Sequence, residues 1–193
     1  MEALKQKILD EGRVLPGNVL KVDSFLNQQI DVKLMEAIGK EFALRFADDS
    51  IDKVLSIESS GIAPALMVAK ELGVPMVFAR KRKSLTISEN VYSVDLFSYT
   101  TQKHTQVIVD QRFLTAGERI LIIDDFLANG QAAEGLLKII SRAQAIPVGL
   151  GVLIEKSFQS GRQLLEKANV RTESLVRISS LVDGHVIFSD DGK

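Results

Sequence analysis

The sequence has 193 residues, 46% hydrophobic and 25% charged, which is the balance of a globular protein with enough apolar material for its own core. It contains no cysteine, which excludes disulfides, a thiolate nucleophile and cysteine-based zinc sites. A formal net charge of −1 disfavours a dedicated nucleic-acid binder, and no apolar run approaches the roughly 18–20 residues of a membrane span. We therefore expect a cytoplasmic protein with no nucleic-acid or membrane partner.

Two helical patterns come first, over residues 2–11 and 31–48. Apolar residues recur every four positions in the second pattern, which predicts a buried stripe on one helix face. Asp31 has the side chain and the position of an N-cap for this helix. The stretch between the two helices is irregular but rich in apolar residues.

From residue 53 onward, continuous apolar runs alternate with helical patterns. The runs predict strands at 53–59, 75–80, 118–125 and 148–155, helices at 61–73, 130–144 and 161–168, and weaker strands within 174–188. This alternation predicts an α/β fold, a parallel sheet with helices on both faces. Ligands of such sheets bind at the carboxyl ends of the strands, so the strand-to-helix turns are the candidate site.

Residues 81–118 interrupt this alternation. They are polar, rich in Ser and Thr, and alternate in a way that fits a hairpin or a long loop. A connection of this length inside a domain is often a functional lid that closes over a site. A simple surface hairpin is the alternative interpretation, and the sequence leaves both open.

The third strand ends in the most informative motif, ILIIDDFLANGQAAEGL, at residues 120–136. Asp124 and Asp125 follow four apolar residues, and a turn of small residues leads from them into a helix. A helix start with a close-wrapping turn presents free backbone N–H groups, which suits a phosphate. The turn comprises Ala128, Asn129, Gly130, Gln131 and Ala132. The alternative is a strand that simply leaves the sheet through a polar turn.

This motif resembles the phosphoribosyl pyrophosphate (PRPP) binding motif of the type I phosphoribosyltransferases. The resemblance implies that Asp124 and Asp125 hold the ribose hydroxyls and that residues 128–132 hold the phosphate. The family usually has Thr or Ser where this chain has Asn129 and Ala132. Some members place a carboxylate at the position of Ala128, as a base near the purine. Here the base must come from elsewhere, or the purine must bind already deprotonated, for which xanthine is acidic enough.

Two other turns resemble further parts of the same family site. The turn at Ser59, Ser60 and Gly61 resembles the pyrophosphate loop, in which a non-proline cis peptide often orients the amides. The basic segment after the second strand resembles the one that precedes the family's flexible loop and neutralises the departing pyrophosphate. Its candidate residues are Arg80, Lys81 and Lys83. Taken alone, a basic run is more often a solvated surface patch.

The purine side of the site rests on two segments. Residues 153–165 (LIEKSFQSGRQLL) resemble the part of the purine enzymes that lines the base pocket, so Lys156 would donate to an exocyclic oxygen. Residues 19–31 (VLKVDSFLNQQID) resemble the base-covering hood of the xanthine-specific members. That likeness implies apolar cover from Leu20 and a hydrogen bond from Asn27. An exposed lysine after a strand is the plain alternative for Lys156.

The resemblance spans nearly the whole chain and implies one phosphoribosyltransferase domain. Its expected parts are helices and part of the hood at 1–50, the core at 51–80 and 119–170, a flexible loop or hairpin at 81–118, and strands at 171–193. The implied substrates are PRPP and xanthine, with Mg²⁺ held mainly by PRPP and pyrophosphate and no protein metal site. A homodimer is also implied. Hypoxanthine or guanine specificity, and a PRPP-sensing regulator without catalysis, remain the alternatives.

Overall fold

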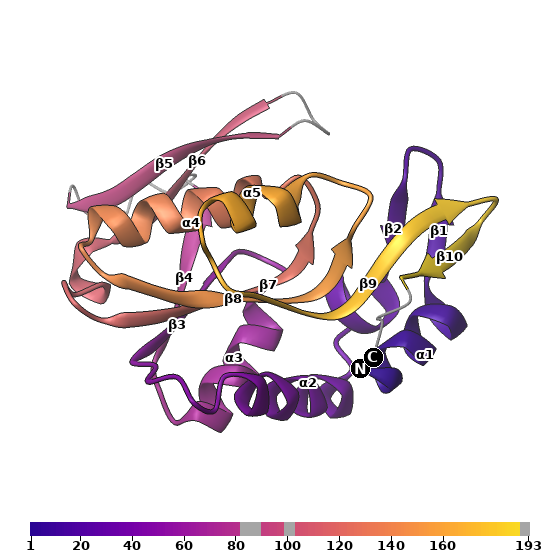
Figure 1. The fold of residues 1–193 in the computed structure, drawn as a ribbon, viewed down its shortest axis with the longest axis horizontal. Coiled ribbons are helices and arrows are strands. Elements are labelled where there is room, and N and C mark those ends of the chain that lie inside the picture. The colour runs from indigo at the N-terminus through magenta and orange to yellow at the C-terminus, as the bar shows by residue number, and fades with distance from the viewer. Residues whose placement is uncertain (82–89, 99–102, 190–193) are drawn as a thin grey trace.

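The computed structural model describes residues 1–81, 90–98 and 103–189, and its centre is an eight-stranded sheet (Figure 1). The strand order is β10-β9-β8-β7-β3-β4-β6-β5. Strands β9, β8, β7, β3 and β4 run parallel, while β10, β6 and β5 pair antiparallel at the two edges. The bounds are β3 Lys53–Ile57, β4 Met76–Lys81, β5 Val91–Ser98, β6 Lys103–Asp110, β7 Arg119–Leu127, β8 Ile146–Lys156, β9 Thr172–Val182 and β10 His185–Phe188.

Helices cover both faces of this sheet, as the sequence predicted. In Figure 1, α2 and α3 lie below the sheet and α4 and α5 lie above it. The bounds are α1 Glu2–Glu11, α2 Val32–Arg45, α3 Ile62–Leu72, α4 Gln131–Arg142 and α5 Gly161–Lys167, with a short 3₁₀ turn, η2, at Gln111–Phe113. Side chains of β7 alternate between two cores: Leu121 and Ile123 pack with α2 and α3, whereas Ile120 and Ile122 pack with α4.

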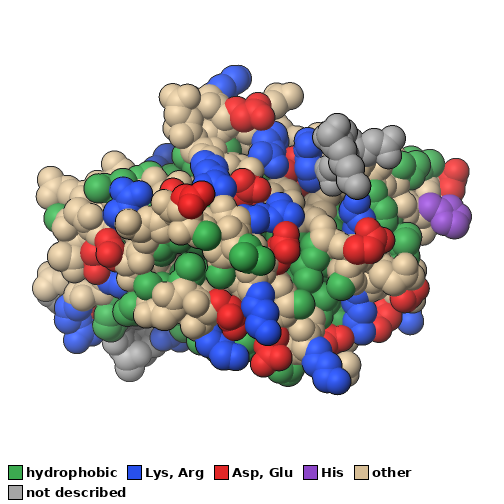
Figure 2. All heavy atoms as spheres, turned by 60° about the horizontal axis from the view of Figure 1, so that its bottom comes forward, with side chains coloured by type: hydrophobic (Ala, Val, Ile, Leu, Met, Phe, Trp, Pro, Cys, Tyr) green, Lys and Arg blue, Asp and Glu red, His purple; other side chains and the backbone are tan. Residues whose placement is uncertain are grey.

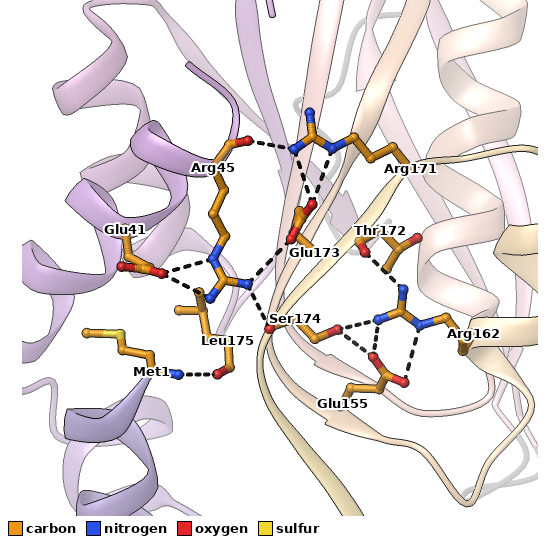
Figure 3. A network of polar contacts seen from close by, with 10 residues as sticks. All are labelled: Met1, Glu41, Arg45, Glu155, Arg162, Arg171, Thr172, Glu173, Ser174 and Leu175. Carbon is orange, nitrogen blue, oxygen red and sulfur yellow. Dashed lines mark hydrogen bonds and ion pairs between the residues drawn. The ribbon is translucent and has the colours of Figure 1, made fainter. Parts of the chain in front are cut away.

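The N-terminal helices follow from their sequence patterns. The Asp31 side chain accepts a hydrogen bond of 3.1 Å from the Leu34 amide, so the predicted N-cap is present. The four residues of the predicted stripe are all buried: Leu34, Ile38 and Phe42 in α2, and Phe46 directly after it. The helix ends at Arg45 rather than at residue 48, and the Arg45 side chain contacts the sheet. Arg45 donates to the Ser174 carbonyl and pairs with Glu173, which ties α2 to β9 (Figure 3).

The stretch between α1 and α2 has more structure than its sequence predicted. It forms a hairpin of β1 (Arg13–Leu15) and β2 (Val19–Lys21), then a π-helical turn, η1 (Asp23–Asn27). Gly17 and Asn18 turn the hairpin with φ of 80° and 60°. Val22, Phe25 and Leu26 join the core that contains α2 and α3. We call residues 13–27 the hood.

The polar insertion between β4 and β7 contains a hairpin of two long strands. Strand β6 pairs with the end of β4, where Arg80 faces Ile108 and Lys81 faces Val107. The hairpin therefore extends the sheet with two antiparallel strands, where the sequence suggested only a hairpin or a loop. Residues 82–89 and 99–102 of this insertion are outside the described part of the chain.

Acidic and basic side chains alternate over the side of the molecule that carries α2 and α3, with apolar side chains between them (Figure 2). Such mixing is the usual appearance of a solvated surface and agrees with a net charge of −1. None of the helices described here has both the length and the apolar character needed to cross a membrane.

Candidate active site

The two carboxylates predicted at the end of β7 lie within its last four residues, and the strand continues in the sheet as far as Leu127. Asp124 and Asp125 are 6% and 9% exposed, and an Asp124 carboxylate oxygen accepts a 3.0 Å hydrogen bond from the Asp125 amide. Burial raises the pKa of Asp124 well above its usual value, and the neighbouring charge of Asp125 raises it further. The Asp124 carboxyl therefore holds a proton more strongly than an ordinary aspartate does.

The small-residue turn after these carboxylates encloses a cavity. Gly130 has φ of 85° and precedes α4, whose first amides have no intrahelical carbonyl to bind. The cavity has a volume of about 130 Å³ and is lined by the whole turn, Ala128, Asn129, Gly130, Gln131 and Ala132, together with Asp124 and neighbouring apolar residues. A concavity made of backbone donors at a helix start binds anions, phosphate above all.

The turn after β3 lies next to the end of β7, because β3 and β7 are neighbouring parallel strands. The Glu58–Ser59 peptide bond is cis, as in the family loop that this turn resembles. Gly61 has no space for a side chain: an added Cβ would lie 2.8 Å from the Asp124 carboxylate and closer still to the Ser56 hydroxyl. Gly61 therefore lets the turn approach the paired carboxylates closely.

The basic segment at the end of β4 is joined to the same turn by Glu58. The Glu58 carboxylate accepts a 2.7 Å hydrogen bond from the Lys81 amide, and its other oxygen lies 3.8 Å from Arg80 Nε. Lys81 is also close enough to Asp124 for its charge to oppose the rise in the pKa of that carboxyl. Lys83, the third predicted cation, lies outside the described residues.

A cavity of about 430 Å³ joins these parts. Its lining includes Glu58 and Ser60 from the β3 turn, Lys81 from β4, and Asp124 and Asp125 from β7. Strand β6 of the hairpin contributes Thr105 and Val107. No group of three or more His, Cys, Asp or Glu side chains suited to a metal ion occurs in the described ranges 1–81, 90–98 and 103–189.

The predicted purine side chains come from β8 and the hood. Lys156 ends β8, and its ammonium donates a 2.9 Å hydrogen bond to the Asn18 carbonyl at the hood turn. The same ammonium lies 5.6 Å from the centre of the Phe126 ring, and burial lowers its pKa. Leu20 is buried in the core, while Asn27 is exposed at the end of η1. Lys156 therefore connects the sheet to the hood.

Sequence reasoning assigned no role to six residues that line the cavity of about 430 Å³: Ile57, Glu58, Leu96, Thr105, Val107 and Phe126. A signal existed for Glu58 and Phe126, because both directly adjoin residues that were predicted. No local signal existed for Thr105, since its place depends on how β6 pairs with β4.

The described geometry is that of an anion-binding turn, a paired carboxylate and a basic segment at neighbouring strand ends. The sequence itself matches the phosphoribosyl transferase domain over residues 22–175. The chain belongs to the phosphoribosyltransferase family. The matched region contains the ends of β3, β4, β7 and β8, and therefore every described part of the candidate site except the N-terminal part of the hood.

Relatives of known function match almost the full length of the chain. The xanthine phosphoribosyltransferase of Leuconostoc mesenteroides is 57% identical over 97% of this chain and 100% of its own. That of Stutzerimonas stutzeri is 56% identical over 98% of this chain and 100% of its own. The xanthine phosphoribosyltransferase of Bacillus cytotoxicus is 54% identical over 97% of this chain and 95% of its own.

Solved structures share the fold at lower sequence identity. The adenine phosphoribosyltransferase of Rhodothermus marinus superposes with a TM-score of 0.75 at 22% identity and covers 92% of this chain and 100% of its own. The yeast enzyme from Saccharomyces cerevisiae, solved with adenine and an iminoalditol bisphosphate, gives 0.72 at 20% identity over 91% of this chain and 99% of its own. The type I phosphoribosyltransferase fold predicted from the sequence is therefore confirmed, with antiparallel strands added at both edges.

Proposed function

We propose that this protein transfers the phosphoribosyl group of PRPP to xanthine, which yields xanthosine 5′-monophosphate and pyrophosphate in purine salvage. One structural observation carries the proposal: the paired carboxylates Asp124 and Asp125 lie between a backbone anion cradle and a basic segment, at one end of a parallel sheet. PRPP has the same order of groups, with ribose hydroxyls between two phosphorylated ends. Xanthine as the acceptor is supported by the xanthine phosphoribosyltransferases that are 57% and 56% identical to this chain over almost its whole length.

The substrate groups are assigned by charge and by the available donors. The 5′-phosphate binds the turn at residues 128–132, because that turn and the start of α4 offer backbone N–H groups. The ribose hydroxyls donate to Asp124 and Asp125. The pyrophosphate binds the amides of Ser59, Ser60 and Gly61 and the cations Arg80 and Lys81, with Lys83 as a further predicted contact. Each assignment pairs an anion with donors and a hydroxyl with an acceptor.

The reaction breaks the bond between the anomeric carbon and pyrophosphate and forms a bond from that carbon to a purine nitrogen. Positive charge spreads over the ribose as the bond breaks. Once ionised, Asp124 and Asp125 stabilise that charge across a short, buried distance. Sugar hydroxyls that donate to Asp124 favour its ionised form, so PRPP binding lowers the pKa that burial had raised.

We assign Mg²⁺ to the substrate rather than to a protein cage. The described cavity offers a pair of adjacent aspartates and no larger ligand cluster within residues 1–81, 90–98 and 103–189. This fits a cation that keeps most of its ligands from water and phosphate. A cation held in this way would supply positive charge beside the pyrophosphate, in addition to that of Arg80 and Lys81.

The purine is recognised between β8 and the hood. Lys156 has three donor protons, and one of them is used on the Asn18 carbonyl. The remaining protons donate to the base, while Asn27 hydrogen-bonds to it and Leu20 adds apolar cover. Ala128 supplies no carboxylate to take a proton from the purine, so the acidic base xanthine enters already deprotonated.

A steady-state assay tests the proposal with PRPP, Mg²⁺ and each of xanthine, guanine, hypoxanthine and adenine. We expect the highest kcat/KM with xanthine, and we expect Asn27→Ala and Lys156→Met to lower it by about tenfold or more, since loss of a recognition hydrogen bond is costly. Lys40→Met, on the exposed face of α2, is the matched control and should leave kcat/KM unchanged.

Other outcomes of the same assay are decisive. A higher kcat/KM with guanine or hypoxanthine would retain the enzyme class and overturn the xanthine assignment. PRPP binding without nucleotide formation from any base would identify a sensor rather than an enzyme. We also propose, on the family resemblance, that the protein is cytoplasmic and forms a homodimer; exposed apolar side chains at Leu66 and Phe78 are consistent with a subunit contact.

A further inference from the structure

Two glycines meet where the phosphate-binding turn touches the start of α5. An added Cβ on Gly130 would lie 3.1 Å from the Gly161 Cα atom. An added Cβ on Gly161 would lie 2.7 Å from Leu127 and would overlap the Ala128 carbonyl oxygen. A side chain at Gly161 would therefore require the backbone to shift, and at Gly130 the close approach and the positive φ both favour glycine.

A hydrogen bond fixes this contact. The Gly161 amide donates to the Ala128 carbonyl at 2.9 Å, at the first residue of the phosphate-binding turn. The Ala128 carbonyl is thereby held on the α5 side of the turn. Since a trans peptide unit is planar, the Asn129 N–H points away from the Ala128 carbonyl and hence away from Gly161. Asn129 lines the cavity of the turn. The orientation of the Asn129 amide thus depends on Gly161.

The start of α5 is itself anchored to the sheet. Arg162, the residue after Gly161, forms an ion pair with the buried Glu155 of β8 and donates to the Thr172 carbonyl at 2.9 Å and the Ser174 hydroxyl at 3.0 Å (Figure 3). Glu155 is 0% exposed. These contacts join α5 to β8 and β9. These contacts consequently fix the position of Gly161 relative to the sheet, and the hydrogen bond from Gly161 fixes the phosphate-binding turn.

From this arrangement we infer that Gly161 is a positioning residue for the 5′-phosphate of the substrate. It acts through the Ala128 carbonyl and touches no substrate atom itself. The inference rests on the proposed function, because it assigns the 5′-phosphate to the turn at residues 128–132. It adds that the affinity of this turn for phosphate is set from outside the turn, by the glycine that begins α5 and by its Arg162 anchor.

The test is Gly161→Ala, with binding of ribose 5-phosphate and of pyrophosphate measured separately by calorimetry. Only ribose 5-phosphate carries the group that the turn binds, whereas pyrophosphate uses the β3 turn and the basic segment. We expect the dissociation constant of ribose 5-phosphate to rise about tenfold to a hundredfold, the cost of a misplacement near 1 Å, and that of pyrophosphate to change by less than about threefold. KM for PRPP should rise more than kcat falls.

Two further variants make the outcome clear. Gln163→Ala changes an exposed side chain of α5 and should leave both affinities as in the wild type. Arg162→Lys keeps the positive charge but loses the guanidinium hydrogen bonds to Thr172 and Ser174. We expect its dissociation constant for ribose 5-phosphate to rise about threefold to tenfold. This variant tests the inference even if Gly161→Ala does not fold.

Equal weakening of both ligands in Gly161→Ala would indicate a general disturbance and would overturn the inference, as would wild-type affinity for ribose 5-phosphate in Arg162→Lys or in folded Gly161→Ala. The proposed function fails in a different way. If the wild-type protein forms no nucleotide from any purine, the proposed enzymatic activity is refuted. If Gly161→Ala nevertheless weakens the binding of ribose 5-phosphate, the role of Gly161 is upheld.

Discussion

The ends of β7 and β8 each carry a buried carboxylate, and the pKa values of the two are shifted in opposite directions. Asp124 on β7 is 6% exposed and Glu155 on β8 is 0% exposed. Burial and the neighbouring Asp125 raise the pKa of Asp124. Burial acts on Glu155 in the same direction, but hydrogen bonds from Arg162 and Ser174 outweigh it and hold the pKa of Glu155 below the usual value.

The difference teaches that internal partners, rather than burial, separate a structural carboxylate from one available to a ligand. Glu155 has its oxygens occupied by groups from α5 and β9, so it stabilises the fold and has little capacity left for a substrate. Asp124 has an acid beside it and faces a cavity. Its poor solvation costs stability in the free protein, and a ligand that donates hydrogen bonds recovers that cost.

Asp124→Asn should have the largest effect. We expect kcat/KM for PRPP to fall by about a hundredfold to a thousandfold, because a preorganised charge near the reacting carbon is lost. At neutral pH the variant should nevertheless be more stable than the wild type, since Asn needs no buried charge. Thermal unfolding should record this gain as a rise of about 2–4 °C for each kcal/mol.

The gain from Asp124→Asn should depend on pH. Between the ordinary aspartate pKa and the raised pKa of Asp124, the folded protein binds more protons than the unfolded chain, so wild-type stability falls as pH rises. The advantage of the variant should be full above the raised pKa and vanish as pH falls to the ordinary aspartate range. Asp48→Asn, an exposed position on the same chain, should show no such trend. A constant advantage at all pH values would contradict this account.

Glu155→Gln should change stability in the opposite direction. Loss of the carboxylate leaves Arg162 and Arg177 without a counter-charge, and we expect a loss of about 2–3 kcal/mol. This lies below the 3–5 kcal/mol typical of a fully buried pair, because both arginine side chains reach solvent. Denaturant unfolding measures the loss, with Glu166→Gln on the exposed face of α5 as the matched control. A stabilised variant would mean that Glu155 resembles Asp124 after all.

Ser174→Ala should have the smallest effect and sharpens the comparison. It removes one hydrogen-bond donor from Glu155 and one hydrogen-bond acceptor from Arg162, and it leaves the ion pair between Glu155 and Arg162 in place. The expected loss of unfolding free energy is about 1–2 kcal/mol, since two hydrogen bonds are lost and each usually contributes about 1 kcal/mol. kcat/KM should stay within about twofold of the wild-type value. Activity loss out of proportion to the stability loss would show that the Glu155 network does more than support α5.

The contrast also shows what the sequence can predict. Asp124 stands in a contiguous motif, since its strand, its acidic partner and its phosphate turn follow one another along the chain. The N-cap at Asp31 and the stripe on α2 are local in the same way. Glu155 gives a weaker signal, because two of its partners, Ser174 and Arg177, lie on β9 and meet it through the pairing of β8 with β9. Contacts of this kind depend on tertiary pairing and leave no periodic trace.

The same reason explains the remaining differences between expectation and structure. The place of β5 and β6 at the sheet edge follows from pairing with β4, which a polar alternating sequence cannot specify. The hydrogen bond from Lys156 to the Asn18 carbonyl joins two residues that are 138 positions apart in the sequence. The sequence indicated several of the residues that line the cavities at the strand ends. How the hood, the hairpin and α5 hold them was set by packing between distant segments.

The pairing of β3 with β7 has a consequence for how the protein is made. Leu55 pairs with Ile122, although β4, β5 and β6 lie between them in the sequence. During synthesis β3 therefore has β4 as its only neighbouring strand until the chain has been extended through β7. Closing so long a loop costs entropy that local contacts do not offset. We expect the catalytic centre to be completed late in folding, by the same strand pairing that brings the β3 turn beside Asp124.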